Sequence, residues 1–146
     1  MTTSTATAQW QGDLKSGKGE FTINNGEFTG QYSFPSRFEG NKGTNPEELI
    51  GAAHAACFSM AFSNELAKAG FTPINVSTRA DVTLSKTDTG FGITNITLTC
   101  EGDVPNISSA QFNELANAAK TSCPVSKALA SVPEIKLQAT LKKAAA

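Results

Sequence analysis

The central part of the chain has the clearest pattern, because residues 49–64 contain no Asp, Glu, Lys or Arg. Helix-terminal signals flank this stretch. Asn45 can cap the first turn, Pro46 suits the first helical position, and Gly70 suits the residue after a helix end. We therefore predict a helix over residues 46–69. Its small and apolar residues fall on most sides, so we expect it to be a buried central helix.

Segments of alternating apolar and polar residues follow this helix. Residues 74–84 and 96–100 have a two-residue period, and residues 87–90 form a turn signal between them. Such a pattern is typical of paired strands with one face on a core. Residues 135–141 repeat the alternation and predict a last strand.

A second helical segment is predicted between these strands. Ser108 and Gln111 have the spacing of a capping box, and the helix should run to about residue 122. Pro124 then interrupts it and opens a short helix to about residue 130.

The first 43 residues are rich in Gly, Ser, Thr and Asn and contain short strand-like pieces at residues 9–10 and 20–23. Residues 24–26, Asn-Asn-Gly, predict a hairpin turn. We expect residues 34–38 to be a loop or a strand edge. The order of elements predicts one α+β domain over residues 1–146, with an antiparallel sheet.

Composition narrows the class of protein. A chain of 146 residues suits a single domain, and a net charge of −1 argues against nucleic-acid binding. No apolar run approaches the roughly 20 residues of a membrane span, and the polar N-terminus resembles no signal peptide, so we expect a cytoplasmic protein. Three cysteines and one histidine show no metal-ligand spacing, and no nucleotide-binding motif is present. We therefore expect no metal and no cofactor.

The cysteines are the main candidates for chemistry. Cys57 lies in the middle of the predicted central helix, where it is either an inert core thiol or, beside a cation, a nucleophile. His54 is its neighbour one turn away, which allows a cysteine hydrolase or a structural histidine. Cys123 precedes Pro124 and would cap the short helix, where it is either a structural cap or packing residue or an accessible thiol with a lowered pKa. Cys100 shares a strand face with apolar residues and is assigned to the core.

The segment from Arg37 to Met60, RFEGNKGTNPEELIGAAHAACFSM, resembles the first cysteine motif of the OsmC/Ohr family, and of its OsmC branch in particular. Residues 69–73, AGFTP, and residues 123–126, CPVS, match further along. The start, residues 10–19, is also similar to OsmC, so the resemblance covers nearly the whole chain.

This resemblance implies an OsmC-like α+β fold, an intertwined homodimer and a hydroperoxide reductase. It assigns attack on the peroxide to Cys57, resolution to Cys123, activation of the thiolate to Arg37 and the orientation of that arginine to Glu47. Substrates would be organic hydroperoxides, the reductant an external dithiol such as a lipoyl group on a protein, and the setting a stress response. Four phenylalanines would line an apolar approach to the site: Phe34, Phe38, Phe58 and Phe62.

Two other functions stay open from the residues alone. A Cys57–His54 cysteine hydrolase or acyl-transfer enzyme would depend on His54 and tolerate loss of Cys123. A non-catalytic dimeric ligand-binding protein would tolerate loss of both cysteines.

Helix geometry adds one expectation of its own. Glu47 and Cys57 are ten residues apart in one predicted helix, which corresponds to about 15 Å along the axis and roughly 80° around it. No glutamate side chain spans that distance. If Glu47 belongs to the Cys57 site, it must therefore come from a partner subunit, or the helix must break between the two residues, where Gly51 is the weak point. We expect a face of small residues to let two such helices pack about a two-fold axis: Ala52, Ala53, Ala56 and Ala61.

Overall fold

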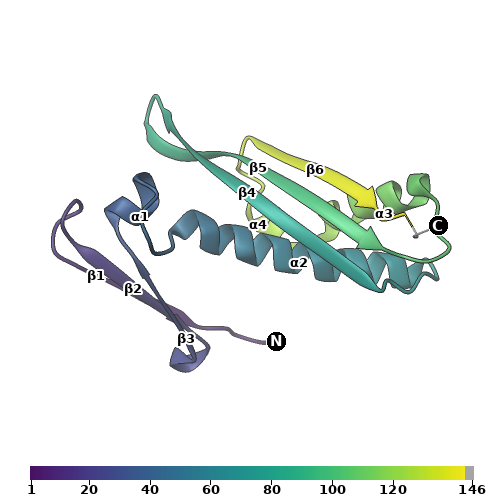
Figure 1. Ribbon diagram of the computed structural model, residues 1–146, viewed down its shortest axis with the longest axis horizontal. Helices are drawn as coiled ribbons and strands as arrows, with labels where there is room; N and C mark the ends of the chain where they lie inside the picture. The colour runs from purple at the N-terminus through teal and green to yellow at the C-terminus, as the bar shows by residue number, and fades with distance from the viewer. Residues whose placement is uncertain (144–146) are drawn as a thin grey trace. The chain divides into compact units, whose positions relative to one another are not determined.

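A computed structural model describes residues 1–143 of the chain; residues 144–146, the alanine run at the end of the sequence, lie outside the described part. By its internal contacts the chain divides into an N-terminal unit, Met1–Leu49, and a C-terminal unit from Ile50 onward. The elements of both units are labelled in Figure 1.

The N-terminal unit contains an antiparallel sheet in the order β1-β2-β3, with strands Ala6–Gln11, Lys18–Ile23 and Phe28–Tyr32. The predicted hairpin turn at residues 24–26 is confirmed as a short 3-10 turn, η1, in which Asn24, Asn25 and Gly26 all have positive φ. Asn and Gly tolerate this conformation better than other residues. The glycine at position 19 is needed for packing, since a Cβ there would lie 2.3 Å from the Tyr32 ring.

The expectation of a loop or strand edge at residues 34–38 is wrong, because this segment forms a short helix, α1, Phe34–Phe38. A capping box explains the helix: the Ser33 hydroxyl accepts from Ser36 N–H, and the Ser36 hydroxyl accepts from Ser33 N–H. Pro35 fits the first turn because it has no N–H to lose there.

Helix α2, Pro46–Lys68, confirms the predicted central helix and its caps. Asn45 Oδ1 accepts from Glu48 N–H at 2.8 Å, and Gly70 adopts φ 89° just beyond the C-terminal end. The helix is unbroken from Pro46 to Lys68, and no proline follows Pro46 inside it, which occupies the first helical position.

The C-terminal unit contains a second three-stranded sheet, in the order β4-β5-β6. Strands β4, Asn75–Thr87, and β5, Gly90–Asp103, form the predicted antiparallel hairpin around residues 88–89. Strand β6, Glu134–Leu141, pairs with β5 in parallel, which corrects the expectation of a wholly antiparallel sheet. The parallel pairing follows from the helical crossover between β5 and β6.

That crossover consists of α3, Ser109–Ser122, and α4, Pro124–Ala128. The predicted capping box at Ser108 and Gln111 is present. Helices α2 and α3 pack together with β5 in one core, where the rings of Phe62 and Phe112 lie 4.9 Å apart, edge to face. The buried apolar residues of β5 are those predicted from its alternation: Ile96, Leu98 and Cys100.

Only one side of α2 is buried within the chain, contrary to the expectation of burial on most sides. The buried side is formed by residues at helical spacing: Gly51, His54, Phe58, Phe62 and Leu66. The opposite side has no charge and is exposed; we call it the α2 stripe, and it is formed by Leu49, Ala52, Ala53, Ala56 and Met60. Ala61, predicted for this face, instead packs against the core.

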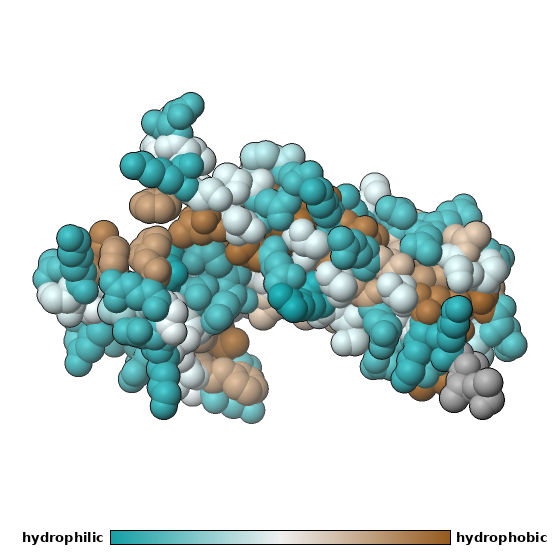
Figure 2. Space-filling model, turned by 45° about the horizontal axis from the view of Figure 1, so that its top comes forward, coloured by the Kyte–Doolittle hydropathy of each residue, from teal (hydrophilic) through white to brown (hydrophobic). Residues whose placement is uncertain are grey.

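The surface view also shows hydrophobic residues exposed among hydrophilic ones (Figure 2). Met60, at 75% exposure, is the residue of the α2 stripe with the largest exposed apolar side chain. Within residues 1–143, no helix is long and apolar enough to cross a membrane.

Candidate active site

Cys57 and Cys123 come together in the C-terminal unit. Cys57 is half-buried in the middle of α2, and Cys123 is fully buried as the N-cap of α4. The two thiols are near enough for each to shift the pKa of the other, and both are free rather than joined in a disulfide. The expectation of an accessible Cys123 is therefore wrong, because this residue is part of the buried core of the unit.

The N-terminus of α4 stabilises a thiolate on Cys123. Burial by itself would raise the pKa of this thiol, but hydrogen bonds from the backbone N–H and the hydroxyl of Ser126, from Cys57 and from the N–H of Val125 outweigh it, so the pKa lies below its ordinary value. The Ser126 N–H donates to Cys123 Sγ at 3.5 Å. The predicted lowering of the Cys123 pKa at a helix N-terminus is thus confirmed.

Cys57 has the opposite tendency. Burial raises its pKa, the Val125 N–H offsets part of this, and the hydrogen bond and charge of Cys123 raise it further. The groups that set this pKa all belong to the C-terminal unit. The two thiols therefore titrate as a pair, and no charged group among the described residues of this unit favours a thiolate on Cys57.

His54 is buried one helical turn before Cys57, yet its hydrogen bond goes elsewhere. Its Nε2 lies 2.7 Å from Ser126 Oγ, and burial lowers the pKa of the imidazole. His54 is therefore neutral and bound to the helix that carries Cys123. It has no position as a base for Cys57.

Arg37 and Glu47 form an ion pair in the N-terminal unit. Arg37 Nη2 lies 2.6 Å from Glu47 Oε1, and Arg37 Nε lies 3.1 Å from Oε2, so the contact is bidentate. Glu47 is nearly buried, with 11% of its side chain exposed, whereas Arg37 retains 34%. The guanidinium also lies over the Phe38 ring, 5.3 Å from its centroid. A partly exposed cation is thus fixed in one orientation by its carboxylate and ring.

The predicted apolar approach made of four phenylalanines is corrected by these positions. Phe58 and Phe62 are completely buried in the core and cannot contact a substrate. Phe34 and Phe38 of α1 instead contact each other, with ring centroids 4.7 Å apart. Only Phe38, beside Arg37, is exposed.

Comparison with known proteins decides the family. A family model for OsmC-like proteins matches residues 39–138, a range that includes Glu47 and both cysteines of the pair. The chain belongs to the OsmC-like protein family.

Members of this family with known names include close relatives of the chain. Peroxiredoxin OsmC of Escherichia coli (strain K12) is 54% identical over 136 residues, which cover 92% of this chain and 94% of that protein. The organic hydroperoxide resistance protein OhrB of Bacillus subtilis (strain 168) is 35% identical over 100 residues, covering 68% of this chain and 72% of the relative.

Solved structures in the OsmC-like family show the same fold. The crystal structure of OhrB of Bacillus subtilis has a TM-score of 0.72 and 28% identity, with 94% of this chain and 98% of that chain covered. An OsmC-like protein from Mycoplasma pneumoniae has a TM-score of 0.76 at 20% identity, with 97% and 99% covered. The predicted OsmC-like α+β fold is thereby confirmed.

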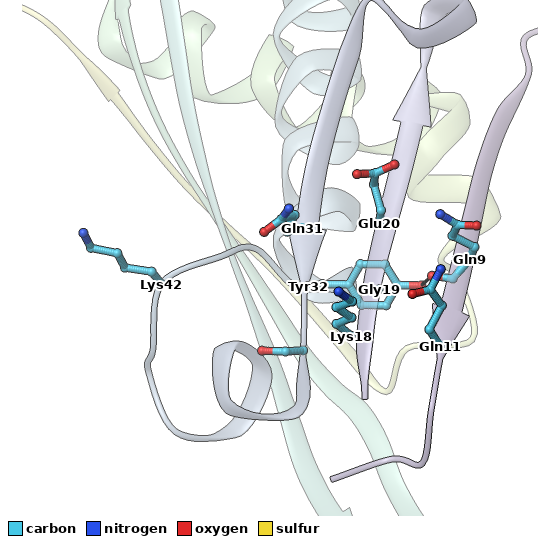
Figure 3. Close-up of a pocket in the computed structure, with 9 residues that line it drawn as sticks. Gln9, Gln11, Lys18, Gly19, Glu20, Gln31, Tyr32 and Lys42 are labelled. Atoms are coloured by element: carbon cyan, nitrogen blue, oxygen red, sulfur yellow. Dashed lines mark hydrogen bonds between the residues drawn. The ribbon is translucent and has the colours of Figure 1, made fainter. Parts of the chain in front are cut away.

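A polar cavity of about 310 Å³ in the N-terminal unit offers a different kind of site (Figure 3). It lies against strands β1, β2 and β3, and the Tyr32 hydroxyl donates to the Gln9 carbonyl at 3.1 Å beside it. Its lining contains no cysteine or histidine: Gln9, Gln11, Lys18, Gly19, Glu20, Gln31, Tyr32, Ser33 and Lys42. The cavity therefore has no thiol for the chemistry that an OsmC-like cysteine pair can perform.

Two groups at the cysteine pair escaped sequence reasoning. Val125 and Ser126 supply N–H donors to the sulfurs, and Ser126 also joins Cys123 to His54. The N-cap position of Cys123 contained a signal for these donors, because a capping side chain accepts from the second or third N–H of its helix. Nothing in the sequence pointed to the contact with His54.

Proposed function

We propose that this chain is a two-cysteine peroxidase that reduces organic hydroperoxides to alcohols in a stress response. The observation that carries the proposal is the direct contact of Cys57 with Cys123, in a chain 54% identical to a protein named Peroxiredoxin OsmC. Relatives named organic hydroperoxide resistance proteins support the substrate class.

The thiolate of Cys57 attacks one peroxide oxygen, the O–O bond breaks, and the alkoxide takes a proton and leaves as alcohol. Cys57 is now a sulfenic acid, oxidised by two electrons. Cys123 attacks its sulfur, forming a disulfide and releasing water. An external dithiol reduces this disulfide by two exchange steps and becomes a disulfide itself. Neither a metal nor a cofactor takes part in this sequence.

Arg37 is proposed as the cation that Cys57 lacks within its own unit. A guanidinium near the sulfur favours the thiolate and keeps its charge at every working pH. Glu47 fixes the direction of the fork through the bidentate contact. Because the two side chains are bound together, whichever subunit supplies Glu47 also supplies Arg37.

We propose that this pair acts on Cys57 of a second subunit in a homodimer. The unbroken helix α2 places Glu47 ten residues before Cys57, about 15 Å along the axis. The uncharged α2 stripe supports a helix–helix contact between two copies, because small residues allow close approach and Leu49 and Met60 would be removed from water.

The reductant and the compartment are part of the same proposal. A lipoyl group on a protein is a dithiol that could reduce the Cys57–Cys123 disulfide, and a reducing cytoplasm keeps such a reductant and the three free cysteines in the thiol form. We also propose that both units form one OsmC-like domain, since the family match at residues 39–138 crosses their boundary.

Consumption of cumene hydroperoxide with dithiothreitol as reductant tests the proposal. Cys57→Ser should abolish turnover, because a hydroxyl is not ionised at neutral pH. In the absence of dithiothreitol, Cys123→Ser should allow a single turnover that ends at the Cys57 sulfenic acid. A cysteine hydrolase would instead retain its activity in Cys123→Ser, and a non-catalytic protein would leave the peroxide unconsumed in wild type.

A further inference from the structure

His54 is buried without a part in the peroxidase chemistry described above. It is 0% exposed, and its Nδ1 is the buried side-chain polar atom without a hydrogen-bond partner among residues 1–143. A buried polar atom without a hydrogen-bond partner lowers the free energy of unfolding. The hydrogen bond of the other ring nitrogen must offset part of that cost. That contact is Nε2 to Ser126 Oγ, at 2.7 Å.

The unpaired Nδ1 determines the tautomer of the imidazole. An orphaned buried N–H is rarer in proteins than an under-used acceptor, so the proton belongs on Nε2 and the lone pair on Nδ1. In this tautomer Nε2–H donates and Ser126 Oγ accepts. The single hydroxyl proton of Ser126 is then free for another acceptor.

We take this acceptor to be the sulfur of Cys123, because the side chain of Ser126 acts on that thiol and lowers its pKa. Ser126 N–H already donates to Cys123 Sγ at 3.5 Å, and Ser126 and Cys123 are both buried at the first turn of α4. We propose that His54 is a positioning residue for the resolving thiol: its Nε2–H holds Ser126 Oγ so that the hydroxyl donates to Cys123 Sγ. The inference rests on the proposed function insofar as Cys123 is the resolving thiol.

A role of His54 as a base is excluded by the same geometry. Accepting a proton through Ser126 would create a buried imidazolium whose Nδ1–H has no acceptor. Burial lowers the pKa of His54, in agreement with a neutral ring. His54 therefore acts through the direction of a hydrogen bond and not by taking the proton of Cys123.

The hydrogen bonds from His54 to Ser126 and from Ser126 to Cys123 favour the thiolate of Cys123 in two steps of the catalytic cycle. In resolution the thiolate is the nucleophile that attacks the sulfenic sulfur of Cys57. In reduction by a dithiol, a Cys123 thiolate of low pKa is the better leaving group. Loss of the Ser126 hydroxyl or of its orientation should slow both steps.

The test uses Cys57→Ser, Cys100→Ser double variants, in which Cys123 is the remaining thiol and no peroxide is needed. The pKa of Cys123 is read from the ultraviolet absorbance of the thiolate against pH. Ser126→Ala and His54→Leu should each raise it, Ser126→Ala by about one pH unit, that is, a tenfold loss in acid dissociation. Ser126→Thr keeps a hydroxyl and His54→Gln has an amide that can donate. In both variants the pKa of Cys123 should stay close to its value in the parent double variant.

Ser122→Ala is the matched control, because the Ser122 hydroxyl lies beside Cys123 but bonds to the Ala119 carbonyl. It should leave the pKa unchanged. A raised pKa in Ser126→Ala together with an unchanged pKa in folded His54→Leu would overturn the role of His54.

A second measurement works on the wild-type chain and needs no variant to fold. The chain has one histidine, so nitrogen-15 NMR of labelled imidazole gives one unambiguous pair of ring signals. We expect the Nε2–H tautomer. The Nδ1–H tautomer would contradict the proposed donation from His54 Nε2–H to Ser126 Oγ, whether or not the protein reduces peroxides.

Discussion

At the scale of residues, the proposed attacking thiol, Cys57, has no charged neighbour among the described residues of its own unit that favours the thiolate. Burial and Cys123 both raise the pKa of Cys57, while the donors of α4 favour Cys123. Arg37, fixed by Glu47 and Phe38, is the cation that we propose favours the Cys57 thiolate.

Arg37→Ala should therefore raise the pKa of Cys57 and slow peroxide reduction. Removing a positive charge within about 4–6 Å raises a thiol pKa by about one to three pH units. The substitution also leaves the nearly buried Glu47 carboxylate unpaired, so the free energy of unfolding should fall by about 1–3 kcal/mol. Arg37→Lys should rescue the activity only in part, because an ammonium has no planar fork.

Arg79→Ala is the control for this experiment, since Arg79 forms an exposed ion pair with Asp81. It should change neither the thiol pKa nor turnover. An identical Cys57 pKa in wild type and Arg37→Ala would refute the activation by Arg37.

His54 gives a pH dependence of stability whose sign follows from its burial. Its pKa in the folded chain lies below the ordinary 6.5, so below pH 6.5 the unfolded chain binds more protons than the folded chain. The free energy of unfolding should fall as the pH falls through this window, by at most about 1.4 kcal/mol per pH unit. Above pH 6.5, neutral His54 no longer causes any change of the free energy of unfolding with pH.

Denaturant unfolding at pH 7 and pH 5 measures this effect. The carboxylates contribute equally in wild type and in His54→Gln, so the difference between the two proteins isolates the histidine. An equally large drop in both would show that His54 is not buried in its neutral form.

The sequence predicted some of these residue roles and missed others for physical reasons. Cys100 in the core and Cys123 as a helix cap follow from local patterns, and both are confirmed. The burial of Cys123 and the bond from His54 to Ser126 depend on packing between segments 72 residues apart, which no local pattern records.

At the scale of elements, α2 has two apolar sides, and only one of them is covered within the chain. Phe58 and Phe62 pack on the core, while the α2 stripe is left exposed without a charge over three turns. The sequence predicted a helix that is apolar on most sides and therefore buried on most sides. The sequence alone does not reveal that the second apolar side of α2 is left uncovered by the rest of the chain.

Ala56→Glu should break the proposed contact between two α2 helices. Ala56 is exposed, so the chain should still fold, but a carboxylate in a contact made of small residues would be desolvated without a partner. We expect monomers in light scattering coupled to gel filtration and a loss of most peroxide turnover. Ala118→Glu, the same change at an exposed alanine of α3, is the control. A dimeric, active Ala56→Glu protein would exclude the stripe as the interface.

Caps and turns explain why most element boundaries were predictable. Asn45, Ser108 and Gly70 act locally, so their effect can be deduced from a few neighbouring residues. Helix α1 was not predicted although Ser33 and Ser36 have capping-box spacing, because a proline between two serines is equally typical of a loop. The parallel β5–β6 pair was missed because strand direction is decided by the crossover and not by alternation.

At the scale of the whole molecule, the account requires two chains for one active site. Mixing Cys57→Ser subunits with Glu47→Ala subunits tests this requirement. Their heterodimer would have one site with both defects and one with neither, so about half of the wild-type activity per heterodimer should return. No recovery, with heterodimers confirmed by mass spectrometry, would mean that each chain builds its own site.

The most direct test of the central claim is to map the disulfide after one equivalent of cumene hydroperoxide. Reduced protein is treated without added dithiol, blocked with an alkylating agent, digested and analysed by mass spectrometry. The account predicts a peptide pair joined through Cys57 and Cys123, loss of two thiols per chain, and an alkylated Cys100 thiol. Recovery of three alkylated thiols with the peroxide unconsumed, or a disulfide that includes Cys100, would contradict it.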